Sequence, residues 1–111
     1  MGLAETIFWL LVVHALCDFS LQTDVMAKGK SRHYRTEPPA GQAFFPCWAF
    51  WLSAHALIWG GGMALVLGPA LGAVAALAHW LTDFCKCEGW TTVPVDQAIH
   101  AATLAVLLAW R

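Results

Sequence analysis

The chain has 111 residues, of which 59% are hydrophobic and only 12% are charged, about half the charged fraction of a water-soluble domain. A net charge of −1 with neutral histidines excludes the basic surface of a nucleic-acid-binding protein. The seven tryptophans point to a lipid bilayer as the partner, because indole rings favour the membrane interface.

Four apolar segments follow one another, separated by polar or turn-forming residues. Three of them are shorter than the roughly 20 residues that cross a bilayer comfortably, and they can gain length by extending into flanking residues. We therefore predict an all-α fold, an integral membrane four-helix bundle, with residues 1–111 forming a single transmembrane domain. The predicted spans cover about residues 6–21, 43–67, 70–84 and 94–110.

The connections between these segments carry turn and loop signals. Residues 22–42 are polar and read as a loop, and Gly68 with Pro69 forms a tight turn before the third segment. Pro94 suits the first turn of the last helix. The run Gly60–Gly62 permits a kink or a close helix approach, within the chain or between copies.

The basic residues predict the orientation. With four spans, the connections after the first and third segments share one side, and Arg111 alone lies on the other. The positive-inside rule places these connections in the cytoplasm and both termini outside. The basic residues on the cytoplasmic side are Lys28, Lys30, Arg32, Arg35 and Lys86.

Histidine and aspartate recur four residues apart, a spacing that places both on one helix face. The order is reversed in the last segment, which runs in the opposite direction, and the second segment contributes a single histidine. These residues are His14 and Asp18, His55, His79 and Asp83, and Asp96 and His100.

The four histidines also share a depth. At about 1.5 Å per residue they lie about 8–13 Å from the loop ends of their segments, His55 being the deepest when counted from Pro46. Ionisable groups in lipid are costly and normally face the interior of a bundle. We therefore predict one polar site within a single leaflet, near the cytoplasmic side.

An internal repeat is visible. Residues 14–19 and 79–84 share a histidine, an aspartate and a phenylalanine at the same positions. The two segments that hold them run in the same direction, and each is followed by a segment with one histidine. This pattern suggests a duplicated helix hairpin.

Imidazole and carboxylate together suit zinc, iron or manganese. An aspartate one turn from a histidine either ligates the metal or orients the ring, and a metal-bound water beside a spare carboxylate is a hydrolytic arrangement. Alternatively the pairs hold the bundle together or relay protons without a metal. The predicted metal ligands are His14, Asp18, His55, His79, Asp83, Asp96 and His100, and the predicted catalytic residues are Asp18, Asp83 and Asp96.

Other polar residues have simpler interpretations. Gln22, Asp24 and Gln97 form an outer shell or, as we prefer, lie at the membrane edge as interfacial groups. The basic residues of the loop bind anionic lipid head groups or substrate or, again our preference, only fix topology. His33 is expected in solvent, and the cysteines as reduced thiols.

The ordered motifs resemble a known family. The pattern His-x-x-x-Asp-Phe-x-Leu-Gln at residues 14–22, with His55, His79-x-x-x-Asp83 and Asp96-Gln-x-x-His100, is similar to an uncharacterised family of small bacterial and phage membrane proteins, a domain of unknown function. The resemblance implies a multi-span protein of the bacterial inner membrane and supplies no activity. A looser similarity is to bacterial membrane proteins classed as metal-dependent hydrolases.

Three functions remain open from the residues. The first is metal-dependent hydrolysis of a lipid-like substrate. The second is a transporter or channel subunit for a divalent metal or protons, which predicts polar groups in both leaflets. The third is a non-catalytic phage or bacterial membrane protein that acts by binding a partner. A chain this small encloses little volume, so a homo-oligomer is also expected.

Overall fold

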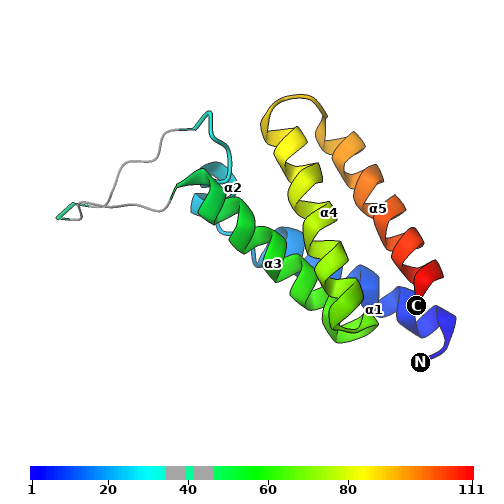
Figure 1. Cartoon of the computed structure of the whole chain (residues 1–111). Coiled ribbons are helices and arrows are strands. Elements are labelled where there is room, and N and C mark those ends of the chain that lie inside the picture. The colour runs from blue at the N-terminus through cyan, green and yellow to red at the C-terminus, as the bar shows by residue number, and fades with distance from the viewer. Residues whose placement is uncertain (35–39, 42–46) are drawn as a thin grey trace.

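The computed structural model describes residues 1–34, 40–41 and 47–111, and the regular structure in these ranges is entirely helical, as predicted (Figure 1). The predicted start of the second span at Ala43, Arg35 in the basic loop, and Pro46 lie outside the described residues. The elements are α1 (Leu3–Ala15), the π-helical segment η1 (Leu16–Ser20), α2 (Asp24–Gly29), α3 (Trp48–Leu67), α4 (Pro69–Cys87) and α5 (Val93–Trp110).

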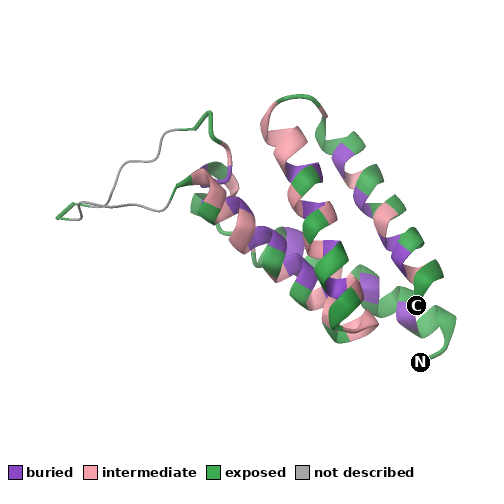
Figure 2. Ribbon diagram, viewed as in Figure 1, coloured by how far each residue is buried: buried purple, intermediate pink, exposed green. Residues whose placement is uncertain are grey.

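Three helical stretches in the described residues are long and apolar enough to cross a membrane: Leu3–Ser20, Trp48–Leu67 and Val93–Trp110. The helices carry large exposed apolar side chains, such as Leu65 at 87% exposure, while several ionisable side chains are buried (Figure 2). This distribution is the reverse of that in a water-soluble protein. It suggests that the helices contact a lipid bilayer.

One prediction about the loops is wrong. Residues 22–42 were expected to lack regular structure, but Asp24–Gly29 form the short helix α2. Thr23 caps it, because its hydroxyl oxygen accepts a hydrogen bond from the Met26 amide at 3.1 Å. Threonine is a preferred N-cap residue, so the sequence did contain a signal for this helix.

The turn between α3 and α4 forms as predicted. Gly68 has a φ of 93°, a backbone conformation that glycine adopts at little cost. Pro69 follows at the first position of α4, where its missing N–H removes no helical hydrogen bond. The two helices are thereby folded back against each other.

Small residues let α3 and α4 approach closely. A methyl group built on Gly60 would lie 2.5 Å from the Cβ of Ala76, and Gly72 packs in the same way against Ala64. Each helix thus presents a pair of small residues four apart, a recurrent means of close packing between membrane helices. Because the backbones come close here, the histidines of both helices reach a common interior.

The remaining glycines of the run have different surroundings. A methyl group on Gly62 would lie 2.5 Å from Val13 and 2.8 Å from the sulfur of Cys17, whereas one on Gly61 would meet nothing within 4 Å. The helix α3 continues through all three positions. Gly60 and Gly62 therefore serve packing within the chain.

The apolar core lies where the long helices meet. Trp59 and Met63 of α3 are completely buried in it. Cys17 belongs to the same cluster, and all four cysteines of the chain are free, as predicted. The other members are Leu10, Ala75, Leu104 and Leu107.

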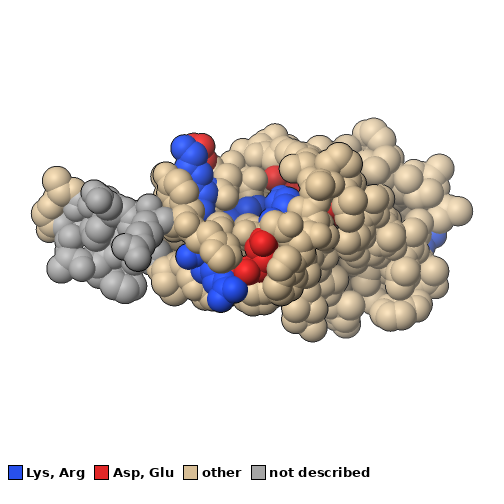
Figure 3. Space-filling view, turned by 90° about the horizontal axis from the view of Figure 1, so that it is seen from above, with Lys and Arg blue, Asp and Glu red and all other residues tan. Residues whose placement is uncertain are grey.

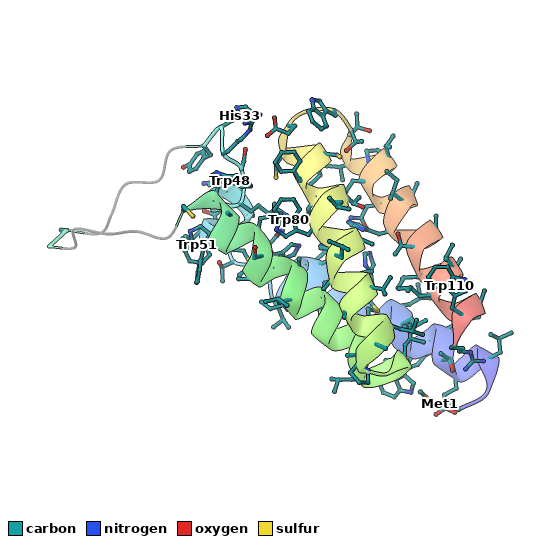
Figure 4. The ribbon with its side chains drawn as sticks, in the orientation of Figure 1. Met1, His33, Trp48, Trp51, Trp80 and Trp110 are labelled. Atoms are coloured by element: carbon teal, nitrogen blue, oxygen red, sulfur yellow. The ribbon has the colours of Figure 1, made fainter. Side chains whose placement is uncertain are left out.

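Tryptophans lie toward both ends of the long helices. Trp48 and Trp51 are at the end of α3 nearest α2, and Trp110 is at the opposite end beside the N-terminus (Figure 4). Trp90, in the connection between α4 and α5, is 69% exposed. This arrangement agrees with the enrichment of tryptophan at both interfaces of membrane proteins.

The close approach of α3 and α4 is tested by Gly60→Ala, with Gly61→Ala as the matched control. The first variant forces a methyl group into the Ala76 contact and should lower the free energy of unfolding by about 1–3 kcal/mol. The second should leave it unchanged or raise it by up to about 1 kcal/mol through helix propensity. Thermal unfolding in detergent measures both, and equal effects would contradict this packing.

Candidate metal centre

Six of the seven predicted site residues are almost completely buried, with exposures of 0–3%. They come from η1, α3, α4 and α5, and ion pairs join two of them to Lys30, directly after α2, and to Lys86, near the end of α4. Figure 1 shows α2 and the α4–α5 turn at the same end of the molecule. The shared depth predicted from the sequence is therefore present. These residues are Asp18, His55, His79, Asp83, Asp96 and His100.

Asp18 lies in the π-helical segment. The Leu21 amide donates to the Leu16 carbonyl at 2.8 Å, five residues back, and such widened turns are frequent at functional sites. The carboxylate oxygen Oδ1 of Asp18 is 3.1 Å from Nε2 of His55 and 3.4 Å from Nε2 of His79. One aspartate thus faces two histidines from two other helices.

Asp83 faces the same two histidines. Its Oδ2 atom is 3.3 Å from Nε2 of His55 and 3.6 Å from Nε2 of His79. Ligand atoms that lie about 2.0–2.1 Å from a zinc ion are about 3.3 Å apart at the tetrahedral angle. The spacing between these imidazole nitrogens and carboxylate oxygens is therefore that of neighbouring metal ligands.

Asp96 and His100 form the other side of the site. Nε2 of His100 is 3.3 Å from Oδ2 of Asp96 and 4.0 Å from Oδ1 of Asp83. Asp83 consequently contacts histidines on both sides and links the two halves.

Three groups in the described residues could hold a metal ion, each with its ligand atoms within 4.8 Å of one another. Asp18, His79 and His100 each take part in two of them. The groups are Asp18–His55–His79, His79–Asp83–His100 and Asp18–Asp96–His100.

The imidazole rings are stacked. The ring of His79 lies between Trp59, at a centroid distance of 4.6 Å, and His100, at 4.3 Å. The Nδ1 and Nε2 atoms of both histidines are buried and have no hydrogen-bond partner among the described residues, as does Nδ1 of His55. Buried polar atoms are normally satisfied, and unpaired imidazole nitrogens beside carboxylates fit a divalent cation.

His14 has a different position from the other predicted ligands and belongs to none of the three groups. The Trp59 indole N–H donates to its Nδ1 at 3.0 Å. The neutral ring therefore carries its proton on Nε2, which donates to Oε1 of Gln97 at 3.0 Å. Both nitrogens of His14 are thus occupied by hydrogen bonds.

Gln97 joins this chain to the aspartates. Its Nε2 atom donates to Oδ2 of Asp18 at 2.9 Å and to Oδ2 of Asp96 at 3.3 Å. The preferred interpretation of Gln97 as an interfacial group is therefore wrong, because its side chain lies at the centre of the polar network. His14 and Gln97 position the two carboxylates.

Lys30 is the main site residue that residue type and spacing did not predict. The expectation that it only fixes topology is wrong, since the residue is 3% exposed and its Nζ donates to Oδ2 of Asp83 at 2.7 Å and to Gln22. Gln22 accordingly belongs to the site rather than to the membrane edge. By contrast, Lys28 is half exposed and pairs with Asp24 on the surface.

Lys86 provides the second cation. Its Nζ lies 3.3 Å from Oδ1 of Asp83 and 3.4 Å from Oδ2 of Asp96. Three aspartates against two lysines leave one formal negative charge when the histidines are neutral. That balance suits a bound cation and disfavours a bound anion.

An ion-pair cluster joins the residues that follow α2 to Glu88 at the end of α4. Arg32 donates to Glu88 at 2.8 Å, and Nε2 of His33 is 3.1 Å from the same carboxylate. The hydrogen bond from Arg32 is the main cause that lowers the pKa of Glu88 to about 2, so the pair is ionised at neutral pH. Figure 3 shows charged side chains gathered at this end, and Figure 4 places His33 near the α4–α5 turn. His33 is exposed, as predicted.

The buried role of Lys30 is tested by Lys30→Met, with Lys28→Met as the matched control. The first variant leaves Asp83 with Lys86 as its remaining lysine and should cost about 3 kcal/mol of stability, as for a broken buried ion pair. The second removes an exposed pair and should cost less than about 1 kcal/mol. Unfolding in detergent distinguishes them, and two equally stable variants would place Lys30 outside the site.

Comparison with known proteins gives a family and no activity. No curated protein and no solved structure matches the chain. A family model described as "Protein of unknown function (DUF3307)" matches residues 6–110. This match confirms the predicted membership of an uncharacterised family, and the chain belongs to the DUF3307 family.

Proposed function

We propose that this protein spans the bacterial inner membrane as a four-helix bundle, binds a divalent metal ion at the His/Asp site, and hydrolyses a lipid-like substrate there. The ion would be zinc, iron or manganese, the metals that imidazole and carboxylate ligands suit. The observation that carries the proposal is the close approach of three buried histidine Nε2 atoms to three buried aspartates. Several of the ring nitrogens have no hydrogen-bond partner in the part of the chain that the structure describes.

The fourth span of this proposal is α4. It has 19 residues, enough to cross a bilayer, but its polar residues His79, Asp83 and Lys86 keep it out of the three apolar stretches. The first two are completely buried, so the bundle shields them from lipid. Arg32 and Lys86 lie at the site's end and Arg111 at the other, which supports a cytoplasmic site.

We assign the metal to the group of His55, His79 and Asp18. One carboxylate oxygen there lies 3.1 Å and 3.4 Å from the two Nε2 atoms, close to the spacing of neighbouring metal ligands. A divalent ion there would supply Lewis acidity and a more acidic water. We assign general-base catalysis to Asp96, whose Oδ1 atom is buried and has no hydrogen-bond partner among the described residues. Asp83 is held by two lysines and would mainly balance charge.

The reaction would be ester hydrolysis. Asp96 takes a proton from water, and the water oxygen bonds to the carbonyl carbon of the ester. The bond between that carbon and the alcohol oxygen breaks, and the alcohol leaves with the proton returned by Asp96. The products are a carboxylic acid and an alcohol.

Transport is the less supported alternative. A pathway for ions needs polar groups through both halves of the membrane. Among the described residues, the buried histidines, aspartates and Lys30 lie toward one end, and Thr6 is the buried polar residue near the other. This one-sided distribution favours a site over a pathway.

Metal content tests the proposal, with His79→Ala and Asp18→Asn as variants and His33→Ala as the control. Detergent-purified parent protein should contain about one divalent metal per chain, because its ligand atoms already lie close together. Both variants should lose it, since each residue belongs to two of the three groups. His33 is exposed, and its removal should spare the metal. Elemental analysis gives the metal-to-protein ratio.

If the folded parent protein holds no metal after incubation with zinc, iron and manganese, the metal site is refuted. Ion pairing or proton relay would then explain the buried histidines and aspartates. Circular dichroism establishes folding, and Asp18→Asn conserves shape if His79→Ala does not fold. Fatty-acid release from phospholipid vesicles tests the reaction separately. If the metal-loaded parent protein releases no more fatty acid than the Asp96→Asn variant, the hydrolytic function is refuted and the metal site is retained.

A further inference from the structure

An apolar groove lies between α1 and α5. Its volume is about 280 Å³, and its lining is almost entirely aliphatic. His14 and Gln97 are the polar side chains that line it. The aliphatic lining includes Leu10, Leu11, Ala101, Leu104 and Ala105.

Hydrogen bonds join the two helices at the polar end of this groove and beyond its other end. His14 binds Gln97 at 3.0 Å, and Arg111 donates to the hydroxyl of Thr6 at 2.9 Å near the termini. Both helices are among the stretches apolar enough to cross a membrane. Leu11, which lines the groove, is 58% exposed, so in a bilayer the groove opens sideways to the hydrocarbon chains of the lipid.

The polar end of the groove belongs to the candidate metal centre. Gln97 lines the groove and donates to Asp18 and Asp96. A ligand that fills the groove must therefore be apolar along its length and polar at the end near Gln97. On α5 the lining runs from residue 97 to residue 108, a length of about 16 Å, which suits a hydrocarbon chain.

We propose that this groove binds one acyl chain of a membrane glycerolipid and places its ester bond at Gln97, beside Asp96. The inference rests on the proposed hydrolytic function and specifies its substrate. A second groove, between α3 and α4, is lined by residues such as Leu57 and Leu77 and includes none of the buried histidines or aspartates. It provides an internal comparison, because lipid there has no access to the site.

The test uses phosphatidylethanolamine with a photoactivatable diazirine on one acyl chain. It is present in trace amounts in nanodiscs that hold the full chain and are made of ether-linked phosphatidylcholine, which has no ester bond. Labelled peptides are mapped by mass spectrometry. Added unlabelled phosphatidylethanolamine should compete away the labelling of α1 and α5, so that this labelling is saturable, and it should not do so at the α3–α4 groove.

Ala105→Phe fills the α1–α5 groove. If it displaces about two methylene groups, labelling there should fall about tenfold.

Ala102→Phe is the matched control, because Ala102 is exposed on α5 and does not line the groove. It should label as the parent does. Unsaturable labelling at α1 and α5, or equal labelling of Ala105→Phe and Ala102→Phe, would overturn the proposal. Metal content measured on the same samples separates the two hypotheses: saturable labelling without metal would refute the metal site alone, and metal without saturable labelling would refute the groove alone.

Discussion

The structure depends on the cost of burying charge. Asp83 is completely buried among apolar helices, and an isolated carboxylate there would be very unfavourable. Lys30, Lys86 and the histidines surround it, so the end of α2 and the helices α3, α4 and α5 are all held to one point. The same requirement explains why the polar residues gather at one end and leave the rest of the bundle apolar.

The close contact of α3 and α4 makes this site attainable for a short chain. Gly60 and Gly72 allow the two backbones to approach, which brings His55 and His79 within 4.9 Å of each other between ring centroids. Trp59 then connects the core to the site, because it stacks on His79 and donates to His14. Packing and chemistry therefore share residues, and the proposed lipid groove lies along α1 and α5, on the side of His14 and Gln97.

Periodicity and spacing predicted the helices, the turn at Gly68 and the gathering of six site residues, because helical geometry alone fixes which residues share a face and a depth. They did not predict Lys30, since nothing local distinguishes it from Lys28; its burial depends on how α2 folds over the site. Spacing also could not predict that the Trp59 indole N–H donates to Nδ1 of His14, a hydrogen bond that sets His14 apart from the other predicted ligands. Gln97 had a usable signal, its place directly after Asp96 on the helix that enters the site.

X-ray absorption spectroscopy of the zinc-loaded protein in detergent tests the central claim most directly, because it reports the atoms bound to the ion. We predict nitrogen and oxygen ligands at about 2.0–2.1 Å from the zinc ion, together with the outer-shell scattering of imidazole rings. Sulfur at about 2.3 Å would assign the ion to cysteine instead. Zinc that is removed by a desalting column, so that no spectrum remains, would contradict a metal centre in this protein.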